Sequence, residues 1–315
     1  MKNVSVYIGD KLARYGFGSE HPFGTDRMSA FWDYAVQHDI NERVIIKEPV
    51  DATDEQILLF HTADYLKHVK KCSIDAKGYI DCGDTPAIKG IYESALTVVG
   101  TTLDAVKAVM NQSIKRAFIP IAGLHHATRS SAAGFCVFND CGIAIEYLKN
   151  QYGLNRIAYV DIDAHHGDGV FYAFESDPGV IFADIHEDGR TLYPGTGATT
   201  ETGHGIAAGT KLNLPVKADS DDEVFMAEWT KIEAFLVKHQ PEFILLQCGA
   251  DSISGDPITH LNFSTRAHSH AAKRLCELAN DLCQGRLVVL GGGGYNRTNL
   301  AQTWTAVVEA LINNS

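Results

Sequence analysis

The sequence predicts a single α/β domain over residues 1–315, with a mostly parallel central sheet covered by helices on both faces. Short apolar runs alternate with segments whose apolar residues recur at helical spacing, a pattern typical of parallel sheets. Hydrophobic residues make up 45% of the 315 residues, which is enough for the core of one large domain. Neither an internal repeat nor a Pro- and Ser-rich linker interrupts the sequence.

The spacing of apolar residues places each expected element. Helices are expected near 26–37, from Thr53 with a capping box to Gln56, and at 88–110, 139–151, 220–239, 264–283 and 298–312. Strands are expected at the apolar runs 117–121, 156–160, 243–246 and 287–290. The segment 186–209 contains six glycines; it is too long for a simple connection and is expected to frame the entrance of a site.

The residues that follow the second of these strands predict the chemistry. Positions 161 to 169 read Asp-Ile-Asp-Ala-His-His-Gly-Asp-Gly. Alternate side chains of an extended backbone point to the same side, so Asp161, Asp163 and His165 are expected on one face. A single Asp here would be typical of a solvated loop. Three acids with two histidines indicate a metal or proton-transfer site instead.

Polar groups also follow the other three strands. The pair His125 and His126 follows the first strand, Asp251 follows the third, and Tyr295 follows four glycines after the fourth. Each group is weak evidence alone, because such residues are also common in ordinary turns. Ligands of open parallel sheets bind beyond the carboxyl ends of the strands, so these groups are expected to meet there.

Asp163, His165 and Asp251 are the predicted metal ligands. A catalytic zinc ion typically has three protein ligands and an open position for water and substrate. Two carboxylates and one imidazole form an oxygen-rich site in which Fe²⁺, Co²⁺ or Mn²⁺ compete with Zn²⁺. We expect zinc, although the ligand types alone do not select it. Such an ion lowers the pKa of a bound water to about 7 and polarises a carbonyl oxygen.

The remaining polar groups are predicted to move protons and stabilise charge. We pair Asp161 with His125 and Asp168 with His126, because a carboxylate fixes the tautomer of an imidazole and makes it more basic. The hydroxyl of Tyr295 is expected to lie against a developing oxyanion. Together these groups predict hydrolysis of an amide through a tetrahedral intermediate.

These residues resemble the histone deacetylases and their bacterial relatives, among them the acetoin-utilisation type and the acetylpolyamine amidohydrolases. The resemblance extends from Glu20-His21-Pro22 through Phe60-His-Thr-Ala-Asp-Tyr-Leu to Gly291-Gly-Gly-Gly-Tyr295-Asn. It implies an arginase/deacetylase-like fold and the same three metal ligands. It further implies that His126 with Asp168 is the general base and acid, that His125 with Asp161 acts electrostatically, and that Tyr295 polarises the scissile carbonyl.

The resemblance also implies a substrate site. Gly134 and Phe135 correspond to one wall of an acyl-lysine tunnel, and Tyr193 corresponds to the other wall. Asp84 corresponds to an acid that holds the substrate backbone, and Gly293 of the glycine run is counted with the substrate-binding residues.

Three positions depart from the family pattern. Asp184 stands where many eukaryotic relatives have a serine of a structural potassium site, so K⁺ is expected only in an altered site. Ile258 stands where polyamine-selective relatives have a glutamate, and an apolar residue there argues against a strict polyamine enzyme. Tyr193 replaces the more usual tunnel phenylalanine. Arg27 matches the pattern, as the arginine of an internal product channel.

The predicted function is metal-dependent hydrolysis of an N-acyl group, with acetyl as the expected group, from the lysine of a peptide or protein or from a small acylated amine. Two alternatives stay open: an acetylpolyamine amidohydrolase, and a protein of this fold that binds acyl-lysine or a metabolite without catalysis. An arginase-type ureohydrolase is disfavoured, because it needs a second metal and additional Asp ligands.

Composition limits the partners and the location. A formal net charge of −12 argues against nucleic acid, and no apolar run approaches the ~20 residues that span a membrane. Seven cysteines without a C-x-x-C pair are typical of a reducing compartment. A cytoplasmic protein is therefore expected. Its oligomeric state is left open, a homo-oligomer included.

Overall fold

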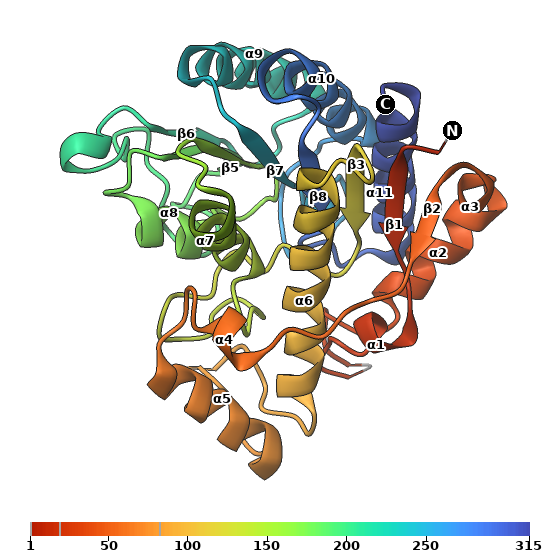
Figure 1. Ribbon diagram of the computed structural model, residues 1–315, viewed down its shortest axis with the longest axis vertical. Helices are drawn as coiled ribbons and strands as arrows, with labels where there is room; N and C mark the ends of the chain where they lie inside the picture. Colours follow the sequence, from red (N-terminus) through yellow and green to blue (C-terminus); the bar gives the residue numbers. More distant parts are fainter. Residues whose placement is uncertain (1, 19, 82) are drawn as a thin grey trace.

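The computed structural model describes residues 2–18, 20–81 and 83–315. Its centre is an eight-stranded sheet (Figure 1). The strands are β1 (Val4–Tyr7), β2 (Ile45–Lys47), β3 (Arg116–Ile119), β4 (Ile157–Asp161), β5 (Val180–Glu187), β6 (Lys211–Val216), β7 (Phe243–Gln247) and β8 (Leu287–Leu290). Their order is β2-β1-β3-β8-β7-β4-β5-β6, and all neighbours are parallel. The predicted α/β class is confirmed.

Helices cover both faces of the sheet. They are α1 (Asp10–Ala13), α2 (Arg27–Gln37), α3 (Ile40–Arg43), α4 (Asp54–Ile57), α5 (Ala63–Asp75), α6 (Ile91–Met110), α7 (Asp140–Tyr152), α8 (Asp168–Phe174), α9 (Asp222–His239), α10 (Thr265–Cys283) and α11 (Arg297–Asn313). On one face α6 packs on β3 and β8, and α7 packs against α6. On the other face α9 and α10 pack on the sheet, and α11 lies between α10 and α2.

The predicted elements correspond to the structure within a few residues. The four predicted strands are β3, β4, β7 and β8, and the predicted helices are α2, α4, α6, α7, α9, α10 and α11. The expected capping box is present, since Gln56 Oε1 accepts a hydrogen bond from the Thr53 N–H at 2.9 Å.

Four strands were missed, and one boundary was wrong. The apolar runs of the sequence do not predict β1, β2, β5 or β6. The segment expected as a long loop from 186 to 209 begins too early, because β5 continues to Glu187. The C-terminal half of β5 contains the buried polar residues Asp184, His186 and Glu187. Polar side chains of this kind hide a buried strand from an analysis of apolar runs.

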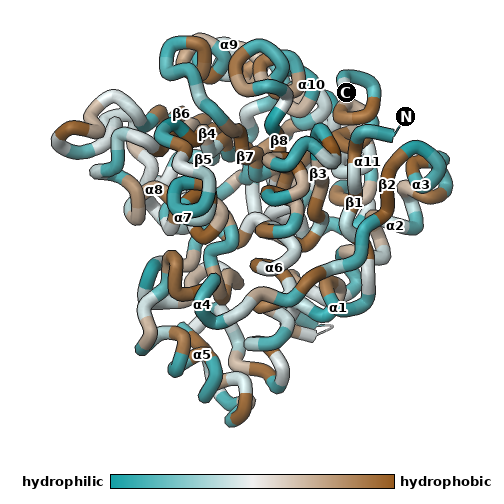
Figure 2. Tube along the Cα trace, viewed as in Figure 1, coloured by the Kyte–Doolittle hydropathy of each residue, from teal (hydrophilic) through white to brown (hydrophobic). Residues whose placement is uncertain are grey.

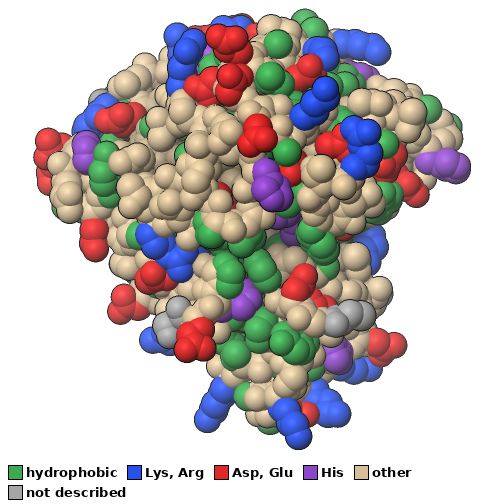
Figure 3. Space-filling model, turned by 180° about the vertical axis from the view of Figure 1, so that it is seen from behind, with side chains coloured by type: hydrophobic (Ala, Val, Ile, Leu, Met, Phe, Trp, Pro, Cys, Tyr) green, Lys and Arg blue, Asp and Glu red, His purple; other side chains and the backbone are tan. Residues whose placement is uncertain are grey.

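The core lies along the central strands. Every residue of β3, β4, β7 and β8 is buried, and apolar residues gather in the sheet and on the helix sides that face it (Figure 2). Figure 3 shows charged side chains spread over one face of the molecule, with hydrophobic side chains gathered in its middle. Among the described residues, no helix has the length and apolar character needed to cross a membrane.

The carboxyl ends of the four central strands lie level with one another. Ile119 at the end of β3 pairs with Leu290 of β8, Leu290 pairs with Gln247 of β7, and Gln247 pairs with Asp161 of β4. The four loops that follow therefore begin side by side at one edge of the sheet. These are the loops in which the sequence places the candidate site residues.

Candidate active site

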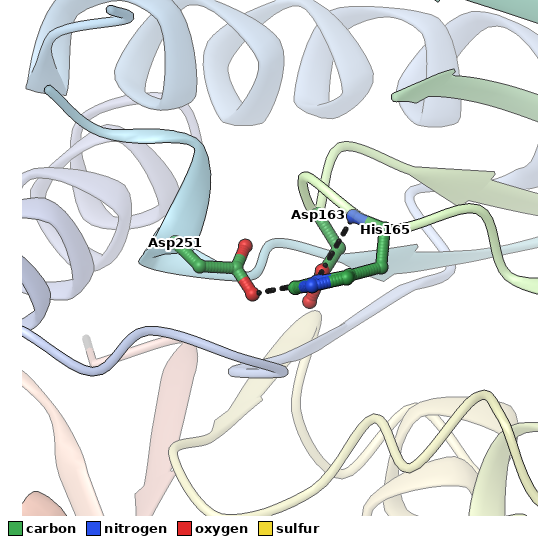
Figure 4. A group of neighbouring side chains, drawn as sticks. All are labelled: Asp163, His165 and Asp251. Carbon is green, nitrogen blue, oxygen red and sulfur yellow. Dashed lines mark hydrogen bonds and ion pairs between the residues drawn. The ribbon is translucent and has the colours of Figure 1, made fainter. Parts of the chain in front are cut away.

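Three side chains from two of these loops converge on one point (Figure 4). Asp163 and His165 follow β4, and Asp251 lies in a short 3-10 turn after β7. His165 Nδ1 lies 3.0 Å from Asp163 Oδ1 and 3.2 Å from Asp251 Oδ2. One ligand atom from each residue lies within 4.8 Å of the others, and all three residues are buried. Two carboxylates and an imidazole at this spacing fit a single divalent cation.

Neighbouring N–H groups hold the two carboxylates in place. The Gln247 side-chain amide and the Gly293 N–H donate to Asp163 Oδ2 at 2.8 Å and 2.9 Å. The Ala164 N–H donates to Asp251 Oδ1 at 2.9 Å. A Cβ atom on Gly293 would lie 2.1 Å from Asp251 Oδ2, so only glycine fits beside the cluster. Hydrogen bonds from neighbouring groups orient the ligands of a metal site in this way.

The two histidines after β3 pair with the two carboxylates expected from the sequence. His125 Nδ1 lies 2.8 Å from Asp161 Oδ2, and His126 Nδ1 lies 2.6 Å from Asp168 Oδ1. The Tyr159 hydroxyl donates a further bond to Asp161 at 2.6 Å. The two imidazole Nε2 atoms are 3.1 Å apart, so both rings turn their free nitrogens toward the same place.

The two imidazoles have opposite tendencies to hold a proton. Burial alone would lower the pKa of His125, but the nearby carboxylates of Asp161 and Asp163 outweigh burial and raise its pKa to about 9. Burial and the charge of His125 together lower the pKa of His126, against the opposing effect of Asp168. At neutral pH His125 is therefore charged, and His126 is neutral and able to accept a proton.

Tyr295 lies across the same small cavity. The cavity is lined by residues of the loops after β3, β4 and β8, among them His126, Asp163, His165 and Tyr295, and its open space is about 10 Å³, roughly the space of one water molecule. The backbone of Tyr295 is held by Asp256, whose Oδ2 accepts the Tyr295 N–H at 2.8 Å. A hydroxyl and a water-sized space thus lie beside the metal-ligand cluster.

Aromatic side chains pack against the residues that line this cavity. Tyr193 packs edge-on against His126 and His165, with ring centroids 5.2 and 6.4 Å apart. Phe135 packs edge-on against Tyr295 at 5.9 Å. A Cβ atom on Gly134 would lie 2.3 Å from His126 Cδ2, so the backbone there can approach the imidazole only as glycine. The residues assigned to the tunnel walls therefore lie where a narrow channel is expected.

Asp84 and Ile258, the two residues expected to select the substrate, differ in chemistry. Asp84 is half-buried, and its Oδ1 accepts the Thr85 hydroxyl at 2.9 Å. Burial and the neighbouring carboxyl of Asp81 raise the pKa of Asp84 to about 6. Ile258 is half-buried, and its N–H donates to Asp256 Oδ1 at 3.1 Å. Asp256 therefore holds both the Ile258 and the Tyr295 backbones.

Comparison with known proteins adds to this geometry. A sequence profile described as the histone deacetylase domain matches residues 21–311. The chain belongs to the histone deacetylase family. Membership confirms the resemblance and the arginase/deacetylase-type fold, and it supports deacetylase-type amide hydrolysis as the activity of the chain.

Several similar proteins are bacterial and share one name. The acetoin utilization protein AcuC of Bacillus subtilis (strain 168) is 36% identical over 301 residues, which cover 93% of this chain and 78% of that protein. Proteins of the same name from Staphylococcus aureus (strain MSSA476) and Staphylococcus xylosus are 32% and 30% identical. Both matches cover 99% of this chain, with 82% and 83% of the relative.

At Asp184, which the resemblance marks as a departure from the family pattern, the structure shows an ion pair between two buried side chains. Asp184 Oδ1 lies 2.8 Å from His186 Nδ1, and Oδ2 accepts the Gly167 N–H at 2.9 Å. The other His186 nitrogen lies 3.0 Å from the Gly197 carbonyl oxygen. Burial alone would lower the pKa of His186, but the Asp184 carboxylate and the Gly197 carbonyl oxygen outweigh burial and raise its pKa, which favours the charged form beside Asp184. The residues do not require a K⁺ ion at this carboxylate, and no step of the proposed reaction depends on one.

Arg27 lies behind the glycine run. It is fully buried, and its guanidinium donates to the carbonyl oxygens of Gly292 and Gly294 at 2.6 and 2.9 Å. The guanidinium also stacks on the Phe23 ring, 4.0 Å from its centroid, and lies 5.7 Å from the ring of Tyr295. Arg27 therefore supports the loop that carries Tyr295.

Sequence reasoning missed several residues that shape the site. Gln247 bonds a predicted metal ligand, Asp256 holds the Tyr295 backbone, and Asn139 and Asp140 bond the loop of the histidine pair. Gln247 and Asp256 stand in the same run as Asp251, so their position offered a signal. Asn139 and Asp140 offered no such signal, because they are separated in sequence from the histidine pair whose loop they bond.

Proposed function

We propose that this protein removes acetyl groups from lysine side chains by hydrolysis, with a zinc ion held by Asp163, His165 and Asp251. One observation carries the proposal: Asp163 and His165 of the three-residue cluster line a water-sized cavity that is also lined by the carboxylate-bound His126 and by Tyr295. A base, an oxyanion donor and a Lewis-acid site around one water are the parts that amide hydrolysis needs.

The residues act in a defined order. A divalent ion bound at the three ligands supplies Lewis acidity, which makes water more acidic and polarises the amide carbonyl. His126 accepts the proton of the attacking water and then passes it to the leaving lysine amine. Asp168 keeps His126 in the tautomer whose Nε2 carries no proton. The Tyr295 hydroxyl donates a hydrogen bond to the carbonyl oxygen as negative charge develops on it.

The charged His125 has a separate part in this reaction. It lies against Asp161 and 3.1 Å from His126 Nε2. Its positive charge opposes a second proton on His126 and so keeps the base free before reaction. The same charge stabilises the anionic tetrahedral state.

The side chains of Ile258 and Asp84 favour an acyl-lysine over an acylated polyamine as substrate. An aliphatic Ile258 provides no countercharge for the distal ammonium of a polyamine. The carboxylate of Asp84 is able to accept hydrogen bonds from the peptide N–H groups beside an acyl-lysine. The acetylpolyamine amidohydrolase is thus the second candidate. A protein that only binds acyl-lysine has no need of Tyr295 or of two carboxylate–histidine pairs.

A substrate panel with and without chelator tests the function. The panel contains acetyl-lysine peptides, longer acyl-lysine peptides, N-acetylputrescine and N-acetylspermidine, compared by kcat/KM. We expect the acetyl-lysine peptides to be the best substrates and chelation to abolish turnover, with recovery on addition of Zn²⁺. A wide preference for acetylated polyamines would make the second candidate correct. Binding of acetyl-lysine peptide without any turnover would identify a binding protein.

Tyr295→Phe should lower kcat by about 10²–10³-fold, because a single oxyanion donor contributes that much. The ring is kept, so its packing on Phe135 is preserved. KM should change much less, since the charge on the oxygen develops only on the way to the tetrahedral state. Steady-state kinetics on an acetyl-lysine peptide measure both. Tyr34→Phe on α2 removes a phenol hydroxyl remote from the site and should leave kcat unchanged. Wild-type kcat in Tyr295→Phe would mean that the hydroxyl does not contact the substrate.

Asp84→Ala should raise KM for an acetyl-lysine peptide more than KM for N-acetylputrescine, which has no peptide backbone. The pKa of Asp84 is about 6, so its carboxylate is lost as the pH falls through 6. In the wild-type protein, KM for the peptide should therefore rise below pH 6, and this rise should be absent in Asp84→Ala. Asp10→Ala, an exposed acid on α1, serves as the control. Equal losses on both substrates would contradict the assignment.

A further inference from the structure

The loop of residues 120–128, here called the histidine loop, carries the histidine pair and contains neither helix nor strand. Its shape therefore depends on contacts from other segments. Asp140, fully buried at the start of α7, makes the contacts on one side of the pair. Its Oδ1 accepts the Leu124 N–H at 2.7 Å and the Gly123 N–H at 3.1 Å, and its Oδ2 accepts the Thr102 hydroxyl of α6 at 2.8 Å. The main chain is thus held just before the two histidines.

Asn139 makes the contacts on the other side. It is fully buried, and its side-chain amide donates to the carbonyl oxygens of His125 at 3.2 Å and Ala127 at 2.8 Å. These two carbonyls flank His126. The backbone N–H of Asn139 donates in turn to His61 Nε2 at 2.9 Å, which fixes the start of α7 from behind. The dipeptide Asn139-Asp140 therefore holds the histidine loop by hydrogen bonds on both sides of His126.

These contacts differ from ordinary helix capping. The cap of α9, Asp221, accepts hydrogen bonds from Glu223 and Val224 of its own helix. Asn139 also caps its own helix through Oδ1, but its two amide N–H groups point to another segment. Asp140 accepts the amides of the histidine loop. Helix capping alone does not account for the hydrogen bonds that Asn139 and Asp140 make to the histidine loop.

We propose that Asn139 and Asp140 are positioning residues, which hold the main chain of the histidine loop so that His126 faces the water-sized cavity. Asp161 and Asp168 orient the two rings, whereas Asn139 and Asp140 fix the backbone from which the rings project. Both constraints are needed, because a ring is placed by its backbone as well as by its hydrogen-bond partner. This inference rests on the proposed function.

Two variants separate positioning from helix capping. Asn139→Ser keeps a capping oxygen, since serine caps a helix about as well as asparagine, but it removes the two amide donors. Asp140→Asn keeps the shape of the side chain and places an N–H group against other donors. In both variants kcat should fall about 10–100-fold at full metal content, with KM for an acetyl-lysine peptide changed much less. The acid limb of the pH profile of kcat should also move, because the surroundings of His126 change.

The matched control is Asp221→Asn, which makes the same chemical change at the start of α9, far from the histidine loop. It should leave kcat and the pH profile unchanged. If both histidine-loop variants fold, bind metal and keep kcat and the pH profile within about two-fold of the wild type, the inference is overturned, since positioning contacts typically contribute more than that.

A measurement on the wild-type protein covers the case in which the variants fail to fold. The amide protons of Gly123 and Leu124 should exchange slowly with solvent if the Asp140 bonds are permanent. Exchange as fast as that of exposed loop amides would overturn the inference. Failure of the proposed function looks different: the metal-loaded wild-type protein would then lack turnover on every substrate of the panel, whatever the exchange rates.

Discussion

Asp251→Ala should abolish both turnover and tightly bound divalent metal. Two ligands, Asp163 and His165, remain, and two ligands cannot hold a catalytic ion well. Asp251 is the one member of the cluster that the loop after β7 contributes, so the substitution leaves only the two ligands that follow β4. Metal content after dialysis, measured by plasma mass spectrometry, and kcat on an acetyl-lysine peptide test the two parts separately.

The fold should survive this change. Asp251 lies in a turn at the edge of the sheet, and the principal loss is the acceptor of the Ala164 N–H, which costs about 1–3 kcal/mol. A single cooperative thermal transition in Asp251→Ala would show this. Asp64→Ala, which removes an exposed carboxylate on α5, is the control and should bind metal and turn over normally. Stoichiometric metal with wild-type turnover in Asp251→Ala would disprove the ligand assignment.

His126→Ala should lower kcat more than His125→Ala does. General acid–base catalysis contributes about 10²–10⁴-fold, and the geometry assigns it to the neutral His126. His125 is the charged partner, with a pKa of about 9, so its removal should weaken electrostatic stabilisation without removing the base. Steady-state kinetics at equal metal content compare the two variants.

The pH profile gives an independent check of the same roles. A base works only when unprotonated, so activity falls as the pH falls through the pKa of His126. Burial and the charge of His125 put that pKa below its ordinary value of 6.5, and the acid limb of kcat/KM should lie below pH 6.5 accordingly. His38→Ala, which removes an exposed imidazole directly after α2, should leave the profile unchanged. A larger loss in His125→Ala than in His126→Ala would reverse the two roles.

The sequence predicted the centre of the sheet better than its sides. Apolar runs mark β3, β4, β7 and β8 because these strands are buried on both faces and consist almost wholly of hydrophobic residues. The strands on either side of this central group were missed. In β5 the polar residues interrupt the apolar pattern, yet they are buried, because Asp184 pairs with His186 and Glu187 accepts the His260 N–H at 2.9 Å. A partner as distant in sequence as His260 is invisible to a local pattern.

The candidate site also contains residues that the sequence could select and residues that it could not. Residue type and position after a strand were enough to select Asp163, His165 and Asp251, and to pair each histidine with its carboxylate. The contacts of Asn139 and Asp140 could not be selected in this way, since both residues look like an ordinary helix start. Their importance depends on which loop lies against that helix.

By itself, then, the sequence determined which residues follow the ends of buried strands and what chemistry those residues can perform, because local spacing controls strand formation and side-chain type controls reactivity. Only the tertiary structure decided that β3, β8, β7 and β4 are neighbours, with their ends level. Strand order and register result from packing between segments far apart in the chain. That packing, rather than any local motif, brings the histidine pair, Asp163, His165 and Tyr295 around a cavity the size of one water molecule.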